Sequence, residues 1–548
     1  MTSPSPGIIT HTTTAADIIA RRLHAAGCRT AFGIPGGEVI SMVDALERAG
    51  IRFVLTKHEN AAGFMAEGTY HRTGAPGILV ATLGPGVANG LNVVANAMQD
   101  RVPLIVLTGC VDPEEELTYT HQVFDHAQIY RPITKASLKL AGGAVDVLAD
   151  KAVALALDER PGPVHIDLPI SAARAPQPTP LRARLRATNA ATAPAEGPAL
   201  DEARGWLAGA ERPIMIAGLD ALKAPADAAV AAFCRRFRVP LITTYKAKGL
   251  LPEDDALALG GAGLSPRADA ILLRTVRRAD LILLAGYDPI EMRAGWRNPW
   301  DPTAQHVVEI ATAANAHYMH HASHSFVADV AAGLEVLGRN VAARATWTGG
   351  EPAAAKQELA HAFGQGEAWG PAAIVEEVRA AAPREAIVTV DSGAHRILMS
   401  QVWQAYEPRT VLQSTGFCTM GCALPLAIGA KLADPGRAVV AFSGDAGLEM
   451  VLGELATLRD LKLPLVVVVF VDASLALIEL KQRGSGLANV GVDFGETDFA
   501  ALARAFGGAG ALCETRAGLA AAMARALAAE TFTVIACRIP RQSYDGRL

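Results

Sequence analysis

Two aspartates, Asp445 and Asp472, are the residues whose type and spacing most strongly suggest chemistry. Each follows an apolar run that predicts a β-strand, residues 438–443 (AVVAFS) and residues 465–471 (LVVVVFV). One helical segment, residues 448–461, separates the two runs, so we expect two parallel neighbouring strands. Because ligands of open parallel sheets bind beyond the carboxyl ends of the strands, both carboxylates should face one crevice.

The turn after the first of these strands is built from small residues, Gly444-Asp445-Ala446-Gly447. Small residues let main-chain N–H groups approach a bound phosphate. Carboxylate oxygens are ligands that Mg²⁺ and Ca²⁺ prefer. The pattern therefore predicts a divalent cation that bridges the two aspartates and a phosphate-bearing ligand. The alternative is that the two aspartates belong to ordinary loops, because Asp-Gly and Asp-Ala turns are common after strands.

The stretch from Gly444 to Asp472 resembles the signature of enzymes that use thiamine diphosphate (ThDP). That signature opens with Gly-Asp-Gly and ends about this far on in Asn or Asp. Here Ala446 takes the third position, and Asp472 stands where Asn is commoner. The resemblance implies that Mg²⁺ is held by Asp445, Asp472 and the main-chain carbonyl of Ser474.

Composition bounds the class of protein. The chain has 548 residues, which suggests about three or four domains. Its net charge of −5 gives no reason to expect nucleic-acid binding. Its seven cysteines form no CxxC pair and predict free thiols in a reducing cytoplasm. The N-terminus shows no signal-peptide pattern, and no apolar run approaches the roughly 18 residues that span a bilayer, so we expect a soluble cytoplasmic protein without membrane association.

Alternating helical and strand-like patterns divide the chain into three α/β segments, each of which predicts a doubly wound parallel sheet. We expect a first domain over residues 13–173, a central domain over residues 199–337 and a third domain over residues 371–540. Stretches rich in Pro, Ala and Gly, residues 174–198 and 338–370, are predicted as linkers. The first and third segments look like broadly similar units.

The elements of the first two domains follow from the same patterns. The predicted strands of the first domain are residues 51–55, 78–82, 104–108 and 164–168, and its predicted helices are residues 15–26, 38–48, 61–72 and 87–99. The predicted strands of the central domain are residues 214–217, 241–244, 281–284 and 307–310.

Glu59 follows the first of these strands, in the stretch Lys57-His58-Glu59-Asn60. In ThDP enzymes a glutamate at such a strand end protonates the aminopyrimidine ring, and the resulting imino group deprotonates the thiazolium carbon. The resemblance thus implies that Glu59 is catalytic. It also implies that Glu59 of one subunit lies opposite the diphosphate domain of another, so we expect a homodimer or homotetramer with the active site at the subunit interface.

Other residues match cofactor-binding positions of this family. Two glycine turns, residues 32–37 and 84–89, resemble those that line the pyrimidine pocket. His395 matches a residue that contacts the diphosphate, although it could be a surface histidine. Met420 matches an apolar wedge beneath the cofactor, although it could be core filler. The implied cofactor-binding residues are Pro35, Gly36, Glu59, Pro85, Asn89, Gly393, His395, Met420, Gly444, Asp445, Ala446 and Gly447.

Three details resemble the catabolic, flavin-independent acetolactate synthases within this family. They are the stretch His121-Gln122-Val123-Phe124-Asp125, residues 286–291 with Trp296 beyond them, and Asp472 followed by residues 491–495. FAD is therefore not expected. Residues 260–263 (GGAG) could cradle a nucleotide, but four small residues are typical of an ordinary loop.

The same resemblance implies roles in substrate binding. His121 and Gln122 are candidates for proton transfer or substrate orientation, and Gly37, Gln122 and Lys481 are candidate substrate contacts. Lys481 departs from the family, which has Trp or Gln at this position. With Arg483 it favours an anionic acceptor, unless it is simply a solvated lysine.

The function implied is a ThDP- and Mg²⁺-dependent decarboxylase and carboligase of 2-oxo acids, in first place an acetolactate synthase that converts two pyruvate molecules into 2-acetolactate and CO₂. A related enzyme that makes a carboxyethyl-arginine shares Thr120-His121-Gln122 and residues 477–480 (LIEL). Two alternatives therefore stay open. One is another ThDP-dependent lyase, ligase or acyl transferase acting on an anionic substrate, and the other is a ThDP-fold protein without catalysis.

Overall fold

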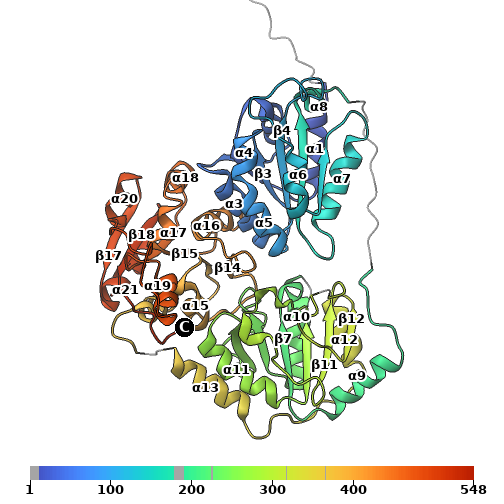
Figure 1. Ribbon diagram of the computed structural model, residues 1–548, viewed down its shortest axis with the longest axis vertical. Coiled ribbons are helices and arrows are strands. Elements are labelled where there is room, and N and C mark those ends of the chain that lie inside the picture. Colours follow the sequence, from blue (N-terminus) through green and yellow to red (C-terminus); the bar gives the residue numbers. More distant parts are fainter. Residues whose placement is uncertain (1–11, 178–189, 224–225, 316, 364–365) are drawn as a thin grey trace, which may run out of the picture. The chain divides into compact units, whose positions relative to one another are not determined.

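The computed structural model describes residues 12–177, 190–223, 226–315, 317–363 and 366–548. Within these residues lie three sheets, each of six parallel strands with helices on both faces (Figure 1). The chain divides into two compact units. The first unit contains the first sheet and leaves out Gln99–Arg101, which belong to the second unit together with the other two sheets.

The first sheet has the strand order β2-β1-β3-β4-β6-β5. Its strands are β1 (Thr30–Ile34), β2 (Arg52–Leu55), β3 (Gly77–Ala81), β4 (Leu104–Cys110), β5 (Ala136–Lys139) and β6 (Pro163–Pro169). Its helices are α1 (Ala15–Ala25), α2 (Ile40–Arg48), α3 (Glu59–Thr73), α4 (Pro85–Asn89), α5 (Leu91–Gln99), α6 (His126–Tyr130), α7 (Val145–Ala156) and α8 (Ile170–Arg174).

Local sequence explains how these helices begin and what they bury. Thr14 caps α1, since its hydroxyl accepts from the N–H of Asp17 while the Asp17 carboxylate accepts from the N–H of Thr14. Apolar residues of α1, α2 and α7 pack with the strands into one buried cluster. Burial of such apolar faces supplies most of the stability of a sheet of this kind.

The third sheet repeats the topology of the first, with the order β14-β13-β15-β16-β18-β17. Its strands are β13 (Ile387–Val390), β14 (Val411–Gln413), β15 (Val439–Gly444), β16 (Val466–Val471), β17 (Ala509–Cys513) and β18 (Thr533–Arg538). Its helices are α14 (Pro371–Ala381), α15 (Ala394–Val402), α16 (Ala423–Ala433), α17 (Asp445–Glu449), α18 (Glu454–Leu461), α19 (Ala476–Gly484), α20 (Phe499–Ala505) and α21 (Arg516–Leu527). The similarity predicted between the first and third segments is present.

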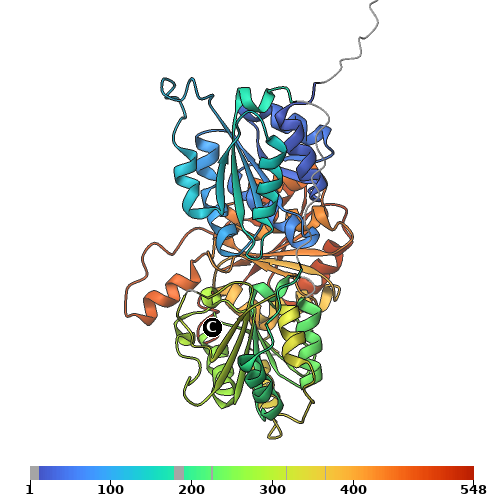
Figure 2. The ribbon, with the colours of Figure 1, turned by 90° about the vertical axis from the view of Figure 1, so that its right-hand side faces the viewer.

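The second sheet has a different order, β12-β11-β10-β7-β8-β9, in which the first and fourth strands of the segment are central neighbours. Its strands are β7 (Pro213–Ala217), β8 (Leu241–Thr244), β9 (Ala258–Ala262), β10 (Leu281–Ala285), β11 (His306–Ala311) and β12 (His324–Val327). Helices flank it on either side in the view of Figure 2. Its helices are α9 (Pro198–Gly209), α10 (Ala226–Phe237), α11 (Pro266–Arg278) and α12 (Val330–Gly338).

Several predicted boundaries differ from the structure. The helix predicted over residues 87–99 is two helices, α4 and α5, separated at Gly90. The helix predicted over residues 448–461 is likewise two, α17 and α18, with the chain turning between them. The linker predicted over residues 338–370 contains helix α13 (Glu351–Ala362), because its Ala- and Glu-rich sequence favours a helix whose Ala355 and Leu359 are buried.

Four strands of the first two sheets are absent from the prediction, β1, β5, β9 and β12, and in the third sheet only β15 and β16 were predicted. Strands β5, β9 and β12 lie at the edges of their sheets, and β1 is next to an edge. Strands β5 and β12 are short and partly exposed, and β9 is buried but contains two glycines, so none of the three has the continuous run of large apolar residues that identified the central strands. Residues 178–189 of the first predicted linker lie outside the described residues. No helix in the described part of the chain combines the length and the apolar character required to cross a bilayer.

Candidate active site

A cavity of about 200 Å³ lies beyond the carboxyl ends of β13, β15 and β16. All of its lining residues belong to the second unit. Nine predicted residues line it: Gly393, His395, Met420, Gly444, Asp445, Ala446, Gly447, Asp472 and Ser474. The other lining residues are Arg293, Ser392, Ala394, Arg396, Cys418, Phe470, Leu475, Ala476, Leu477, Ile478 and Tyr544. The third sheet thus brings together the residues predicted for its half of the site.

Strand pairing places Asp445 and Asp472 next to each other. Strands β15 and β16 are parallel neighbours, and each ends at the residue before its aspartate. The Asp445 carboxylate accepts hydrogen bonds from the main-chain N–H groups of Asp472 (3.1 Å) and Ala473 (2.8 Å). Both aspartates are buried, with 4% and 8% of their surfaces exposed. The predicted juxtaposition of two carboxylates is therefore present.

The electrostatics of this pair fit a divalent cation. Burial, and then the negative charge of Asp445, raise the pKa of Asp472 to about 7. Burial also raises the pKa of Asp445, although three main-chain N–H groups that donate to it act in the opposite direction. Two buried like charges repel one another, and a bound cation would relieve that repulsion.

The oxygen atoms available here fit a hard cation that takes some of its ligands from a bound phosphate group or from water. Among the described residues there is no cluster of three or more His, Cys, Asp and Glu side chains that could hold a metal. A cation at Asp445 and Asp472 would therefore take its other ligands from main-chain carbonyls, water or phosphate oxygens. This mixture of oxygen ligands is typical of Mg²⁺.

Asp391 fixes the turn that follows β15. It is fully buried, and its carboxylate accepts from the N–H groups of Ser392 (2.9 Å) and Cys422 (3.2 Å) and from the Ser443 hydroxyl (3.1 Å). A Cβ at Gly447 would lie only 2.0 Å from Asp391 Oδ2. Glycine is therefore required at this position, and the absence of a side chain leaves the turn pressed against Asp391.

His395 carries a buried nitrogen without a hydrogen-bond partner in the part of the chain that the structure describes. Its ring lines the cavity and stacks on Phe470 with the ring centroids 5.4 Å apart. Its Nε2 has no partner in the structure. Burial and the neighbouring Arg396 lower the pKa of His395 to about 3, so its imidazole is neutral at pH 7. Unpartnered buried polar atoms commonly mark the place of a missing ligand or water, and a phosphate oxygen would satisfy this nitrogen.

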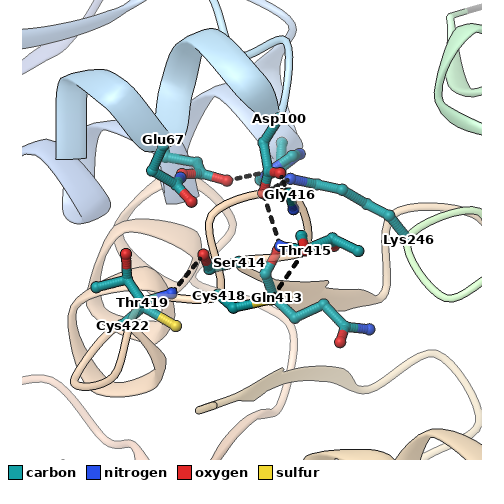
Figure 3. Close-up of polar contacts among 12 residues, drawn as sticks. Glu67, Asp100, Lys246, Gln413, Ser414, Thr415, Gly416, Cys418, Thr419 and Cys422 are labelled. Atoms are coloured by element: carbon teal, nitrogen blue, oxygen red, sulfur yellow. Dashed lines mark hydrogen bonds and ion pairs between the residues drawn. The ribbon is translucent and has the colours of Figure 1, made fainter. Parts of the chain in front are cut away.

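The loop between β14 and α16 is anchored by Asp100, one of the three residues of the 99–101 segment that belong to the second unit. Its carboxylate accepts from the N–H groups of Thr415 (3.0 Å) and Gly416 (2.7 Å) and pairs with Lys246 (2.6 Å) (Figure 3). Asp100 and Lys246 are both at most 3% exposed. A buried, fully engaged ion pair of this kind is a rigid support for the loop.

The same loop carries Cys418 and Met420 to the cavity. Cys418 has a left-handed backbone, with φ of 57°. The N–H of the next residue, Thr419, donates to the Ser414 hydroxyl at 2.9 Å (Figure 3). Met420 is half-buried and lines the cavity, as its predicted role as an apolar wedge requires.

Several lining residues were not identified from the sequence. Arg293 belongs to the loop after β10 in the second sheet, two residues beyond the stretch 286–291 that resembles the catabolic acetolactate synthases. Leu477 and Ile478 come from α19, and Tyr544 comes from the C-terminal tail beyond the predicted domain end at residue 540. Burial, with the charges of the two aspartates, raises the pKa of Tyr544 well above its usual value. Leu477 and Ile478 belong to the stretch 477–480, whose resemblance to a related enzyme assigned them no role, and no local sequence pattern marks Arg293 or Tyr544.

The residues predicted for the pyrimidine ring lie in the first unit. Glu59 is the first residue of α3 and is 4% exposed. Asn89, the last residue of α4, donates through Nδ2 to Glu59 Oε2 at 3.0 Å. Pro85 begins the same helix. The structure therefore joins Glu59 and Asn89 in one hydrogen-bonded pair, although they are far apart in the sequence.

The other predicted residues of the first unit lie in its loops. Pro35, Gly36 and Gly37 follow β1 and lead into a short 3₁₀ turn. His121 is exposed, and Gln122 has a left-handed backbone with φ of 61°. Gln122 lines a second cavity, of about 170 Å³, which also contains Asp125, His126 and Asp167.

The structure does not place Lys481 or Arg483 on the wall of the diphosphate-side cavity. Both lie in the last turn of α19 and are exposed, whereas the beginning of that helix lines the cavity. The Arg483 guanidinium makes two hydrogen bonds to the Asp545 carboxylate, at 2.8 and 2.7 Å. Glu479, which might have paired with Lys481, is buried and accepts from the Ser474 hydroxyl at 2.8 Å.

Comparison with known protein families agrees with this geometry. Residues 13–129 match the N-terminal TPP binding domain of thiamine pyrophosphate enzymes, residues 200–337 match their central domain, and residues 391–537 match their C-terminal TPP binding domain. Each matched range falls within the segment of the chain that forms one of the three sheets.

Individual relatives are similar over most of their length. The chain is 30% identical to the acetolactate synthase of Bacillus subtilis (strain 168), over 95% of this chain and 92% of the relative. It is 29% identical to the catabolic acetolactate synthase of Raoultella terrigena, over 97% of this chain and 96% of the relative. It is 32% identical to a probable 2-ketoarginine decarboxylase of Pseudomonas aeruginosa, over 90% of this chain and 89% of the relative. The chain belongs to the acetolactate synthase-like family of thiamine diphosphate-dependent enzymes.

Proposed function

We propose that the protein is a ThDP- and Mg²⁺-dependent decarboxylase and carboligase of 2-oxo acids, which converts two pyruvate molecules into 2-acetolactate and CO₂. The observation that carries the proposal is the buried pair Asp445 and Asp472 in a cavity that also holds the unpartnered nitrogen of His395. The acetolactate synthases among the relatives support pyruvate as the substrate.

Residues of the second unit would hold the charged end of the cofactor. Asp445, Asp472 and the Ser474 carbonyl would bind Mg²⁺, and Gly393, His395 and the small residues 444–447 would contact the diphosphate. Met420 would support the rings from below. When bound, ThDP would supply a nucleophilic carbon and a sink for the electron pair that decarboxylation releases.

Residues of the first unit would serve the pyrimidine ring. Glu59 would hold and transfer a proton at its carboxylate, and Asn89, which donates to Glu59, would keep that carboxylate oriented. Pro35, Gly36 and Pro85 would line the ring. Gly37, His121 and Gln122 would be candidates for substrate contact or proton transfer, together with Lys481 of the second unit, which does not line the diphosphate-side cavity.

The proposal includes a homodimer or homotetramer in the cytoplasm. Residues 13–173 of one subunit would supply Glu59 to the diphosphate-binding residues 371–540 of another, with residues 199–337 as the central domain. The free state of all seven cysteines is consistent with a reducing compartment. A monomer would then be inactive.

The proposal does not include FAD, although the second sheet has the strand order of dinucleotide-binding folds. Protein side chains occupy the point of that sheet where the strand order reverses, after β7 and β10. Arg101 forms ion pairs there with Asp220 and Asp288, and Asp220 accepts from the Thr312 hydroxyl at 2.8 Å. The purified protein should lack flavin absorbance.

A second candidate is decarboxylation of a 2-oxo acid without ligation, or ligation to a different anionic acceptor. The probable 2-ketoarginine decarboxylase among the relatives favours the first of these. The test is incubation with pyruvate, ThDP and Mg²⁺ followed by product analysis. The proposal expects one 2-acetolactate for each CO₂ released, whereas acetaldehyde as the main product, or no turnover of pyruvate, would support the second candidate.

A further inference from the structure

Cys418 differs from every other cysteine of the chain in its exposure. The six others are buried, with at most 7% of their surfaces exposed, whereas Cys418 is partly exposed. Cys418 also lines the cavity that contains the two aspartates. Cys418 therefore borders the place where cofactor and substrate would bind.

Two guanidinium groups lie beside this thiol, Arg396 from α15 and Arg293 from the loop after β10. Arg396 Nη2 donates to Cys418 Sγ at 3.3 Å, and Arg293 Nη2 lies 4.0 Å from the same sulfur. The thiol itself donates to the Thr415 carbonyl at 3.1 Å. We refer to these residues as the Arg293–Cys418–Arg396 cluster.

The positive charge of this cluster is not neutralised by the protein. Among the described residues no carboxylate forms an ion pair with Arg293 or Arg396. Arg396 is only 3% exposed; its Nη1 donates to the Ser414 carbonyl, whereas its Nε has no hydrogen-bond partner among the described residues. Arg293 is exposed and, like Arg396, lines the cavity. A buried, uncompensated guanidinium favours binding of an anion, and the planar fork of arginine suits a carboxylate.

The apolar neighbours indicate the size of that anion. The same cavity is lined by Met420, Leu477 and Ile478, whose side chains are apolar. They would suit a small alkyl group attached to the carboxylate. The site therefore combines the features that recognise a short-chain carboxylic acid.

We propose that the Arg293–Cys418–Arg396 cluster binds the carboxylate of the acceptor substrate. This inference rests on the proposed function. A carboxylate that leaves as neutral CO₂ loses its charge, so tight ion pairing in the ground state would oppose its departure. The acceptor keeps its carboxylate through the reaction and into the product. The cluster thus selects acceptors that carry an acid group and disfavours aldehydes without one.

Cys418 provides a test that requires neither cofactor nor turnover. In alkylation the thiolate sulfur forms a bond to carbon, the carbon–iodine bond breaks, iodide leaves and the thiol proton passes to buffer. Anionic iodoacetate and neutral iodoacetamide differ in the charge that the cluster would bind. Rates are followed on the intact apoprotein by peptide mass spectrometry, with 2-mercaptoethanol as the reference thiol.

We expect Cys418 to prefer iodoacetate over iodoacetamide by about tenfold relative to the reference thiol, a preference that falls with rising salt. Arg293→Gln should remove most of this preference and Arg293→Lys should restore part of it. Arg297→Gln is the matched control, because Arg297 is an exposed arginine of the same loop that does not line the cavity. An equal preference in Arg293→Gln and the wild-type protein would overturn the inference.

Protection of Cys418 from alkylation by a bound acid gives an independent readout. Pyruvate should slow alkylation of Cys418 by iodoacetamide at concentrations where acetaldehyde and an equal ionic strength of chloride do not. If pyruvate and acetaldehyde protect equally, the cluster does not recognise a carboxylate and the inference fails.

The kinetic consequence separates this inference from the proposed function. In Arg293→Gln the KM for the acceptor should rise, and the product ratio should move from 2-acetolactate toward acetaldehyde. An unchanged ratio together with an unchanged KM would contradict the inference while leaving acetolactate synthesis intact. Conversely, absence of 2-acetolactate from the wild-type enzyme would refute the proposed function, whereas charge-selective alkylation would still report the carboxylate site.

Discussion

The Asp445 carboxylate accepts the main-chain N–H of Asp472 at 3.1 Å, so the two acidic residues that end adjacent parallel strands are joined directly. Because the same carboxylate also accepts from Ala473, its orientation is fixed before any cation binds. Preorganisation of this kind lowers the cost of binding a metal.

Replacing Asp472 with Asn should stabilise the metal-free protein. The substitution removes one of two repelling buried charges, and Asn is the residue commonly found at this position in the family. In EDTA at pH 8, we expect the free energy of unfolding for the first transition in urea to increase by on the order of 1 kcal/mol. Mg²⁺ should bind more weakly but still support cofactor binding. A less stable metal-free variant would contradict the proposed repulsion.

Replacing Gly447 with Ala should disrupt the turn after β15. The added Cβ would lie 2.0 Å from Asp391 Oδ2, a buried carboxylate with three hydrogen bonds and little freedom to move. We expect a loss of about 1–3 kcal/mol and much weaker ThDP binding, measured by thermal denaturation and calorimetry. Gly484→Ala is the control, since no atom lies within 4 Å of its added Cβ. Equal behaviour of the two variants would show that the close packing at Gly447 is unimportant.

Replacing Glu59 with Gln should separate catalysis from binding. The amide preserves size and the hydrogen bond from Asn89 is retained with a neutral acceptor, but the proton-transferring group is lost. We expect product formation to fall by roughly 10²–10⁴-fold, as is typical for loss of a general acid or base. ThDP affinity should change little. Glu114→Gln, on an exposed loop of the same unit, is the control. Wild-type turnover in Glu59→Gln would refute the proposed role.

Stability should fall as the pH rises from about 5 to above 8, because of Glu291. Burial, and to a lesser extent Asp100 and Asp288, raise the pKa of Glu291 to about 8, whereas Lys246 acts in the opposite direction. A group whose pKa is raised by folding stabilises the folded state below its unfolded pKa of about 4.5 and loses that contribution as the pH rises through its folded pKa.

Glu291→Gln imitates the protonated acid and should therefore flatten this dependence. We expect the variant to melt at a higher temperature than the wild-type protein at pH 8.5 and at a similar temperature at pH 5. The melting temperatures of both proteins across this pH range are the measurement. Parallel curves for the two would show that Glu291 does not titrate in this window.

The parts of the fold that the sequence predicted are those with strong local patterns. Strands β15 and β16 are continuous apolar runs, so their pairing and the meeting of Asp445 with Asp472 followed from the β-α-β rule. Edge strands such as β9 lack that pattern and were missed. Helix α13 was assigned to a linker because its composition is Ala-rich and its buried residues are few.

The candidate site was predictable where a residue follows a strand and not where distant segments converge. Asp391 follows β13, but its role depends on its close approach to the turn at Gly447, which no spacing reveals. Arg293 reaches the cavity from the second sheet and Tyr544 from the C-terminal tail. Lys481 was predicted from its position nine residues after Asp472, but it lies in the last turn of α19, whereas the first residues of that helix line the cavity.

The central claim is that a divalent cation held by Asp445 and Asp472 anchors the diphosphate of ThDP. Calorimetric titration of the apoprotein with ThDP, in Mg²⁺ and in EDTA, tests it most directly, with Asp445→Asn as the matched variant. We predict that wild-type affinity falls by at least about 100-fold in EDTA and that Asp445→Asn binds as weakly in Mg²⁺ as the wild-type protein does without it. Equal affinity with and without Mg²⁺, or unimpaired binding by Asp445→Asn, would contradict the account.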